Sequence, residues 1–522
     1  MGVFSAFKDF LNNTSFHGLR FVAQEERHWS ERVFWLVVCL VSWGASAKLM
    51  LASWDAFQNN AISFVVESTY LDWNTTFPTV SVCEEDNMER VYFMSAKIYG
   101  EDHDFNLDEV LKEISYFRGS AYYIKEFCFD GHVKCPQSGF TELARKIRSG
   151  CNDIFVDCRV NNVAFNCCDH FLPLETEIGT CFALNSQQGM RIRGKKDMLP
   201  ILANRRSPKA SVYLELRVQS NVHIHSPEDV PFLNSLSSEV FVAAPLIHKR
   251  FGIAVREIEN EPGVRDTSTI QRKCRFLDEN DLSVYRYYSY SACITQCRKE
   301  AQIRQCGCTT HLMPNAKPQE ICSLEGLMCL YQHYTNFSVL KTSWSRKEGL
   351  YCNCVPSCTE PEYNIVTQES FGISYNTSRI ELRLDRLPSE RYKRNVVRGR
   401  LDMVVSMGGA AGLFVGASLL SFVELLYYFS LRMCRGSSDP DPDEDDKKDN
   451  KDRGGKGSAL AVPVKQGAAV APLAAVFVPP RPSPGLIGHY NSNLLLQDGQ
   501  QGQLPAAAPL PPRQDTAPYS RF

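Results

Sequence analysis

Residues 288–308 read YSYSACITQCRKEAQIRQCGC and residues 351–358 read YCNCVPSC, and these two stretches decide the fold. In the first stretch, Cys293 and Cys297 are four residues apart, so on a helix they share one face about 6 Å apart. In the second, two cysteines separated by one residue would share one face of an extended segment, about 6.6 Å apart. Because the two spacings match, two disulfides of equal pitch can join a helix to a strand.

An antiparallel arrangement of this helix and strand determines which cysteines pair. The predicted ladder has two matched rungs, one outer pair and two smaller loops: Cys293–Cys354, Cys297–Cys352, Cys274–Cys358, Cys306–Cys329 and Cys308–Cys322. Closely spaced cysteines can also hold zinc, so the compartment of the domain decides between the two chemistries.

Composition favours disulfides over zinc. The chain has 522 residues and 20 cysteines, of which 18 fall between Cys83 and Cys358. A cytosolic protein would keep so many thiols reduced, whereas an exported domain oxidises them. The formal net charge of −2 gives no indication of nucleic-acid binding. We therefore predict disulfides, with neither a metal site nor a cofactor.

Two apolar segments explain how the cysteine-rich region leaves the cytosol. Residues 33–54 read VFWLVVCLVSWGASAKLMLASW, long enough to cross a hydrocarbon core of about 30 Å. They follow a polar stretch and lack a small-residue cleavage site, so we predict a retained span rather than a signal peptide. Residues 401–431 would make a straight helix of roughly 46 Å. That length requires tilt, protrusion or a break, and the glycine-rich stretch near Gly416 is the natural place for a break.

Two spans put both termini on the same side of the membrane. The sequons Asn74, Asn336 and Asn376 lie between the spans with the cysteines, so this region is predicted to be extracellular. Basic residues on the outer flank of the second span oppose the positive-inside rule, but that rule weakens beside a large translocated domain. The predicted organisation is a cytoplasmic segment 1–32, a span 33–54, an α+β ectodomain 55–400, a second span 401–431 and a cytoplasmic tail 432–522.

Local patterns give a first outline of the ectodomain and the tail. Strands are predicted at Thr79–Cys83 and Ala210–Val218, and helices at Leu107–Tyr116 and Ala292–Gln305. After residue 435 the chain is charged and then rich in Ala, Pro, Gly and Gln, so the tail is predicted to be disordered. Its PLPPR segment, 509–513, could bind an SH3-like partner, although a solvated tail with incidental prolines is the simpler explanation.

The stretch YSYSACITQCRKEAQIRQCGCTTHLMP, followed by YCNCVPSCTEPEY, resembles the thumb of the degenerin/epithelial sodium channel/acid-sensing channel family. The resemblance runs from the N-terminus through the second span and leaves out only the tail. It implies a trimeric channel whose subunits have palm, thumb and finger regions. Additional cysteines, together with NTSFHGLRF (13–21) and HIHSPEDVP (223–231), look most like the insect pickpocket branch.

Two further motifs of the family concern the first half of the ectodomain. FPTVSVC (77–83) looks like the family's first extracellular cysteine and GTCFALN (179–185) like its palm partner. The resemblance therefore implies Cys83–Cys181, with Cys158–Cys167 nearby. It leaves open the pairing of four additional cysteines: Cys128, Cys135, Cys151 and Cys168.

The second apolar segment is unusual even without the family. Gly408, Gly412 and Gly416 form a GxxxGxxxG stripe, which simple helix packing would explain. The stripe ends at Gly416-Ala417-Ser418, where small residues could expose backbone carbonyls and a hydroxyl to an ion. Glu424 lies inside the segment, where an unpaired carboxylate is costly unless it faces water or a partner.

MGGAAGLFVGASLLSFVEL (407–425) resembles the family's pore helix. The resemblance implies that Gly416, Ala417 and Ser418 form the selectivity filter, where oxygens replace part of the hydration shell of permeant Na⁺. It also implies that Glu424 lies on the cytoplasmic side of the filter. His17-Gly18 resembles the family's His-Gly gating motif, which implies that this segment folds back to line the lower pore. Asp402 could add charge at the outer mouth, or be a solvated acid at a helix end.

Two positions depart from the family pattern. Val405 stands at a gating position, a little before Gly408, where the family usually has a small residue, and its bulk could favour opening. Acid-sensing relatives have a tryptophan just before the first thumb cysteine, but TIQRKCRF (269–276) has none. The absence of this tryptophan means that the coupling of thumb to pore in those relatives is not assumed for this chain.

No motif identifies the gating stimulus. Acid sensing would need clustered carboxylates or histidines, and Glu84-Glu85-Asp86 and the pair His223/His225 are present. Surface solvation explains both groups. Gating by a peptide, a lipid, a pheromone or mechanical force, and constitutive leak, all stay open.

Two other classes of protein share the predicted topology. An ATP-gated channel lacks the cysteine ladder and needs a lysine-rich nucleotide site, which we do not find. An ectoenzyme or adhesion receptor would not need small and acidic residues in a span, and no nucleophile elbow, HExxH or phosphate loop is present. With these alternatives disfavoured, the resemblance implies a non-enzymatic subunit of a homo- or heterotrimeric sodium channel of the amiloride-sensitive type, gated by a ligand or by force. It would lie in plasma-membrane lipid and serve a sensory or epithelial role.

Overall fold

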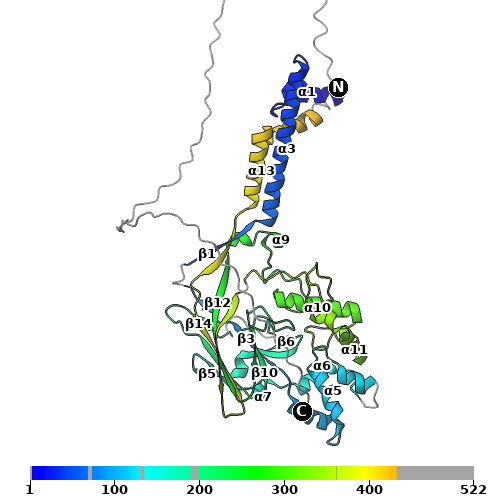
Figure 1. Ribbon diagram of the computed structural model, residues 1–522, viewed down its shortest axis with the longest axis vertical. Coiled ribbons are helices and arrows are strands. Elements are labelled where there is room, and N and C mark those ends of the chain that lie inside the picture. The colour runs from blue at the N-terminus through cyan, green and yellow to red at the C-terminus, as the bar shows by residue number, and fades with distance from the viewer. Residues whose placement is uncertain (1–2, 69–72, 130–134, 190–197, 360, 432–522) are drawn as a thin grey trace, which may run out of the picture. The chain divides into compact units, whose positions relative to one another are not determined.

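The structure is a computed structural model, and it describes residues 3–68, 73–129, 135–189, 198–359 and 361–431 (Figure 1). The predicted disorder of the tail and its proline-rich segment 509–513 lie outside these residues.

The first apolar segment forms α3 (Trp29–Asn59), which extends beyond the predicted span 33–54 at both ends. His28 caps its start, because the ring nitrogen Nδ1 accepts a hydrogen bond from the backbone N–H of Ser30. Among the described helices, α3 is the one that is long and apolar enough by itself to cross a membrane. Two shorter helices, α1 (Val3–Asn13) and α2 (Leu19–Ala23), precede it.

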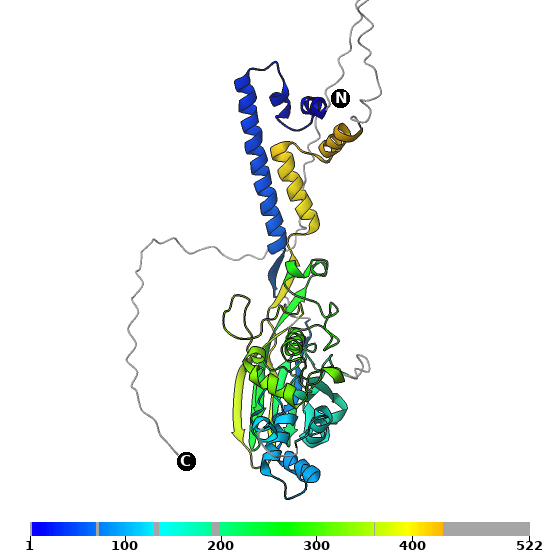
Figure 2. The ribbon, with the colours of Figure 1, turned by 90° about the vertical axis from the view of Figure 1, so that its right-hand side faces the viewer.

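The second apolar segment is broken rather than straight. The helix α13 (Arg400–Val415) is followed by α14 (Leu419–Leu426) and a π-helical turn η6 (Tyr427–Leu431), with a bend of 70° between the two arms. The bend lies at Gly416, where the sequence predicted a break. Together the two arms are apolar and long enough to form one broken span or a re-entrant loop. The helices α3 and α13 run side by side (Figure 2).

Two β-sheets form the core of residues 55–400, for which we keep the name ectodomain after its predicted location. The eight-stranded sheet has the order β1-β15-β12-β14-β9-β4-β5, with β13 also paired to β12, and the five-stranded sheet has the order β11-β10-β3-β7-β6. The first contains β1 (Ile62–Glu67), β4 (Phe155–Val160), β5 (Val163–Phe165), β9 (Ser211–Leu216), β12 (Ile247–Asn260), β13 (Glu362–Gly372), β14 (Ser378–Arg386) and β15 (Arg391–Val396). The second contains β3 (Thr79–Glu84), β6 (Phe171–Thr176), β7 (Gly179–Leu184), β10 (Ser220–His225) and β11 (Val240–Ala243), while β2 (Thr75–Thr76) pairs with β8 (Leu202–Ala203).

Alternation in the strand sequences explains why these segments pair. In β9 the residues Val212, Leu214 and Leu216 are buried while their neighbours are partly exposed, as a strand with one face on the core requires. The largest core cluster combines buried side chains from both sheets, including Val82 of β3 and Leu382 of β14. The two sheets therefore share one core, and further buried clusters lie among the helices.

Helices lie around these sheets, and the two helical runs expected from the sequence, 107–116 and 292–305, agree with α5 and α10 to within two residues. The ectodomain helices are α4 (Met88–Tyr99), α5 (Phe105–Ser115), α6 (Phe140–Ile147), α7 (Cys151–Ile154), α8 (Cys167–His170), α9 (Thr269–Arg272), α10 (Tyr290–Cys306), α11 (Leu324–Gln332) and α12 (Tyr334–Ser338). Short turns complete them: η2 (Ile124–Phe129), η4 (Pro262–Val264) and η5 (Pro318–Glu320). We call residues 274–358 the thumb; α10, α11 and α12 belong to it (Figure 1).

The described residues contain nine disulfides, and the seven pairs expected from spacing and resemblance are among them. They are Cys83–Cys181, Cys158–Cys167, Cys274–Cys358, Cys293–Cys354, Cys297–Cys352, Cys306–Cys329 and Cys308–Cys322. The four cysteines left open pair as Cys128–Cys135 and Cys151–Cys168. Bonded sulfurs offer no thiolate to zinc, so the disulfide interpretation holds for these clusters.

One detail of the ladder prediction is wrong. The segment that carries Cys352 and Cys354 is not a strand of either sheet. The two rungs nevertheless have similar Cα–Cα distances of 5.8 Å and 6.0 Å. The equal pitch needs only locally extended backbone, without the sheet partner that a strand also needs.

Candidate pore and gating site

The bend in the second apolar segment is formed by two helix caps. Gly416 ends α13 in the left-handed region with φ +68°, and its N–H donates to the carbonyl of Gly412 at 3.1 Å. Ser418 begins α14, because its hydroxyl accepts from the N–H of Ser421 at 3.2 Å. Small residues at 416–418 thus allow the chain to turn between two helices with its backbone accessible.

The N-terminal His-Gly pair docks against this bend. The backbone N–H of His17 donates to the carbonyl of Val415 at 3.0 Å. The His17 ring lies so close to Gly416 that a Cβ on this glycine would be 2.6 Å from ring atoms. Gly18, with φ +81°, lies against α3, where an added Cβ would be 2.7 Å from the sulfur of Cys39. The dipeptide therefore connects α3 to the bend.

Glu424 has a specific partner in the same N-terminal segment. Its carboxylate accepts from the Ser15 hydroxyl at 2.9 Å and from the Ser15 N–H at 3.2 Å. The Ser15 hydroxyl also lies 2.8 Å from that of Ser421. This contact satisfies a carboxylate that would be costly in an apolar segment. Sequence reasoning missed Ser15 and Ser421, because nothing in a lone serine indicates a partner some 400 residues away.

Aromatic rings secure the N-terminal segment on both sides. The ring of Phe16 lies 6.3 Å from that of Trp43 on α3, and Phe10 packs against Tyr428 and Phe429 at 5.7 Å and 5.6 Å. Phe10 is buried, although it lies near the start of the chain. The segment therefore joins α3 to both arms of the bent helix pair.

The other predicted pore residues lie along α13 and do not join this cluster. Asp402 accepts from the N–H of Gly399 at 2.9 Å, which makes it a cap at the start of α13. Val405 is 65% exposed, Gly408 is exposed, and an added Cβ on Gly412 would come no closer than 3.9 Å to another segment's backbone, the Ala417 carbonyl. The contacts of α13 with α3 involve serines instead, with the Ser53 and Ser406 hydroxyls 3.0 Å apart.

The sequons differ in exposure. Asn74 and Asn376 are exposed, and the Asn74 side chain accepts from the Asn204 amide at 3.0 Å. Asn336 is only partly exposed and lies within α12.

The interpretation of two polar groups as solvated surface is wrong for Glu84, His223 and His225, whereas Glu85 and Asp86 are partly exposed. His223 and His225 are buried on β10, and Glu84 is buried at the end of β3. Glu84 accepts hydrogen bonds from the Tyr116 hydroxyl at 2.9 Å and from the N–H of Ser149 at 3.0 Å. Alternation in β10 could not have indicated the buried histidines, because it places His223 and His225 on the face opposite Val222 and Ile224. Both faces of this inner strand are buried, which only the sheet order reveals.

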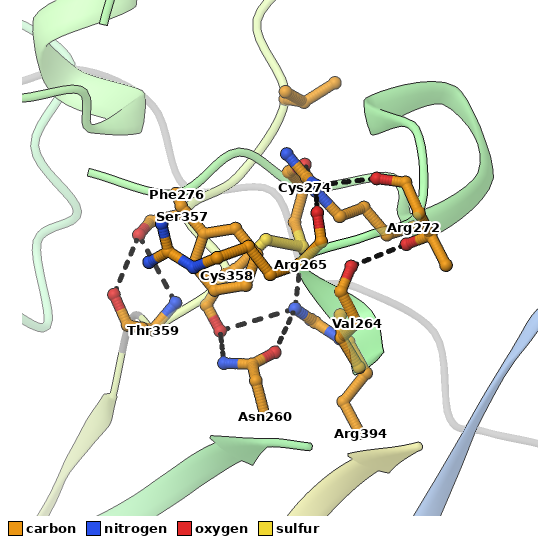
Figure 3. Close-up of a disulfide and its surroundings, with 12 residues drawn as sticks. Asn260, Val264, Arg265, Arg272, Cys274, Phe276, Ser357, Cys358, Thr359 and Arg394 are labelled. Atoms are coloured by element: carbon orange, nitrogen blue, oxygen red, sulfur yellow. Dashed lines mark hydrogen bonds between the residues drawn. A yellow bond between two sulfur atoms is a disulfide. The ribbon is translucent and has the colours of Figure 1, made fainter. Parts of the chain in front are cut away.

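This chain lacks the tryptophan that acid-sensing relatives have just before the first thumb cysteine. Other residues at the base of the thumb nevertheless contact the two apolar segments or the strands next to them. The Gln271 amide donates to the carbonyl of Phe57 near the end of α3 at 3.1 Å. Arg394 on β15, the strand that leads into α13, reaches the disulfide Cys274–Cys358 at the base of the thumb (Figure 3). Its guanidinium donates to the Cys274 sulfur at 2.7 Å and to the Asn260 amide oxygen at 3.1 Å.

Arg394 is a buried cation, and the groups to which it donates hydrogen bonds in the described part of the chain are neutral. It also donates to the Cys358 carbonyl at 3.3 Å and lies over the ring of Phe64 on β1 at 5.0 Å. Burial, together with the nearby guanidinium of Arg272, lowers the pKa of Arg394. β1 follows α3 and β15 leads into α13. Arg394 therefore joins the two strands that adjoin the apolar segments.

Comparisons with known proteins agree with this geometry. The family model described as amiloride-sensitive sodium channel matches residues 10–428. The sodium channel protein Nach of Drosophila ananassae is 23% identical over 461 residues, covering 81% of this chain and 86% of that protein. Pickpocket protein 28 of Drosophila melanogaster is 26% identical over 42% of this chain and 38% of its own length. Acid-sensing ion channel 4-B of Danio rerio is 22% identical over 80% of this chain and 75% of its own length.

The match spans the N-terminal segment, α3, the ectodomain and the bent helix pair. It excludes the ATP-gated, ectoenzyme and adhesion alternatives, since members of the matched family are plasma-membrane cation channels assembled from related subunits, and not enzymes. The similarity to insect Nach and pickpocket proteins agrees with the branch indicated by the sequence motifs. The chain belongs to the amiloride-sensitive sodium channel family.

Proposed function

We propose that the chain is one subunit of a trimeric, sodium-permeable channel with two spans, residues 33–54 and 401–431, and both termini in the cytoplasm. The observation that supports this most is the bend at Gly416–Ser418, which interrupts the second apolar segment and contacts the N-terminal segment. An interrupted helix is tolerated at membrane depth where its free backbone lines a water-filled path or contacts protein.

The chemistry of the bend suits a small cation. The carboxyl end of α13 carries the negative end of the helix dipole, and its last carbonyls have no partners within the helix. Ser418, an exposed residue, adds a hydroxyl oxygen that also caps α14. Three copies around an axis would place a ring of such oxygens at residues 416–418, which can replace part of the hydration shell of Na⁺.

The N-terminal segment is the proposed gate. The His17 N–H donates to the Val415 carbonyl, and the Ser15 hydroxyl donates to the Glu424 carboxylate. Both contacts lie on the side of the bend that faces the cytoplasm in this proposal. A rearrangement of residues 15–18 would change the environment of the bend without breaking any covalent bond. The proposal further includes gating by a ligand or by force and a sensory or epithelial role. It also includes assembly as a homo- or heterotrimer in lipid, and an SH3-like partner of residues 509–513.

Voltage clamp of cells expressing the chain, alone and with related subunits, tests this function. Sodium replacement and amiloride identify the current, and Ser418→Cys should change the sodium-to-potassium permeability ratio. Ser406→Cys, upstream on α13, is the matched control and should leave that ratio unchanged. Surface labelling that shows the protein at the plasma membrane, with no current in any pairing, would contradict a pore-forming role.

A further inference from the structure

A cavity of ≈ 280 Å³ lies where the five-stranded sheet meets the thumb, distant in sequence and in fold from the pore segments. It is bounded by β10, by the loop 226–239 that connects β10 to β11, by the first turn of α10 and by the start of β13. Its volume is near the lower end of the range for small-molecule sites.

A buried histidine in its wall has no partner. His223 is 5% exposed, and neither ring nitrogen has a hydrogen-bond partner in the described part of the chain. By contrast, the ring nitrogens of His225 lie 2.7 Å from the Ser81 hydroxyl and 2.8 Å from the Ser226 carbonyl. Burial lowers the pKa of His223 to about 3, so the ring is neutral and offers one donor and one acceptor. A buried donor or acceptor without a hydrogen bond destabilises the folded protein unless water or a ligand bonds to it.

The wall of the cavity is acidic. Asp229 and Glu239 both line it, and the described lining contains no lysine or arginine. The hydrogen-bond partners of Asp229 are the hydroxyls of Ser226 and Ser291, at 2.7 Å and 2.5 Å, which do not neutralise its charge. Burial and the nearby Asp229 raise the pKa of Glu239 to about 6, so the Glu239 carboxylate is still mostly charged at neutral pH. An occupant with a positive charge is therefore favoured.

The spacing of these groups disfavours a bare metal ion. In the described part of the chain, no three imidazole or carboxylate donors of this cavity come within 4.8 Å of one another. The rest of the wall includes Phe232, Tyr290 and Leu340, which suit an apolar body. A cation that fits must therefore have organic bulk as well as charge.

We propose that this cavity is a binding site for a small organic cation, such as an arylalkylamine. Asp229 and Glu239 hold the charged nitrogen, and the apolar body packs against Phe232 and Leu340. The ring nitrogens of His223 expose less than 1 Å² each in this structure, so they meet a polar group of the ligand only after the ring rotates toward the cavity. Because the walls come from both the sheet and the first turn of α10, a bound ligand holds the thumb against the sheet. A role of this contact in gating rests on the proposed channel function, whereas binding itself does not.

Calorimetry on the purified full-length protein in detergent at pH 7.5 tests the site. The probes are 2-phenylethylamine and 2-phenylethanol, which have similar size and differ in charge. We expect the amine to bind at least tenfold more tightly than the alcohol, and Glu239→Gln to weaken amine binding at least fivefold. Glu101→Gln, at an exposed glutamate outside the cavity, should bind the amine like the wild type.

Two outcomes would overturn the proposal. Equal affinity for the two probes, unchanged in Glu239→Gln, would show an apolar cavity without preference for charge. No heat with either probe, from protein that elutes as a folded species, would show that the cavity holds only water. Leu236→Trp, at an exposed lining residue, provides a second variant that should reduce amine binding without changing a buried charge. Amine binding without any sodium current would reject the channel proposal and leave this one standing.

Discussion

At the scale of single residues, two glycines show how close the N-terminal segment lies to the bend. Gly18 and Gly416 both have positive φ, and at both positions a Cβ would overlap another segment. The first would meet Cys39 and the second the ring of His17. At each position, glycine therefore permits both the positive φ and the close approach of another segment.

Gly416→Ala should abolish or strongly reduce the sodium current. The new Cβ would displace the His17 ring, and the left-handed backbone costs roughly 1–2 kcal/mol for a residue other than glycine. Whole-cell recording, normalised to surface protein, measures the effect. Gly409→Ala is the matched control, since a Cβ there meets nothing within 4 Å. Equal currents from the two variants would show that the His17 contact is not needed for conduction.

At the scale of elements, the two matched rungs of the ladder should behave as a unit. With Cys297–Cys352 intact, the loop that Cys293–Cys354 adds is only a few residues long, so its removal releases little chain entropy. Removal of both rungs frees a much longer loop. Serine replacement of one pair should cost about 2 kcal/mol of stability, and replacement of both pairs more than twice the single effect.

Thermal unfolding of the detergent-solubilised variants, followed by intrinsic fluorescence, measures these losses. Replacement of Cys128 and Cys135, which close a loop of sequence separation 7 elsewhere, serves as a separate reference for a short loop. Additive losses from the two rungs would show that each acts independently.

The contact between β15 and the base of the thumb should protect its disulfide. Cys274 and Cys358 are fully buried, and Arg394 lies against both. Arg394→Met removes the hydrogen bonds to Cys274, Cys358 and Asn260, so this region should open more often and its disulfide should be reduced faster. We expect at least a tenfold faster reaction with a water-soluble phosphine, measured by alkylation and mass spectrometry. Lys393→Met, the adjacent residue on β15, is the control, and equal rates in the two variants would contradict the prediction.

At the scale of the whole molecule, buried titratable groups make stability depend on pH. His311 is buried at the junction of the thumb with α5, where its Nε2 donates to the Ile114 carbonyl at 2.8 Å. Burial lowers the pKa of His311 to about 4, against 6.5 in the unfolded chain. The unfolded state therefore binds more protons between these values, and stability falls as the pH falls.

Between pH 7 and pH 5 this histidine should cost about 2 kcal/mol of stability. His311→Gln keeps a donor for Ile114 but does not titrate, so the loss of stability over this interval should be smaller by that amount. Glu228 acts in the opposite direction, because burial raises the pKa of its carboxyl to about 7 and acid then favours the folded state. The measurement is therefore the difference in unfolding temperature between variant and wild type at each pH. The same pH dependence in both proteins would refute the assignment to His311.

Much of the architecture follows from local sequence. The two apolar segments, the strand alternation at 210–218 and the helical cysteine spacing at 293–297 depend on residues close together in the chain, so periodicity and length reveal them. The break near Gly416 was also foreseeable, because the segment is too long for a straight span and contains glycine at that point. Resemblance supplied the filter, the His-Gly motif and two disulfides, which no local pattern specifies.

The sequence by itself determined the cysteine-rich domain between two apolar segments, the matched rungs and the position of the break, because these are properties of spacing along one chain. Only the tertiary structure decided which distant groups meet. Examples are the contact of Ser15 with Glu424 and that of Arg394 with the thumb disulfide. Another is the burial of His223 and His225, which the sequence analysis placed at a solvated surface. Burial and partnership depend on segments hundreds of residues apart packing together, so their energies cannot be read from either segment alone.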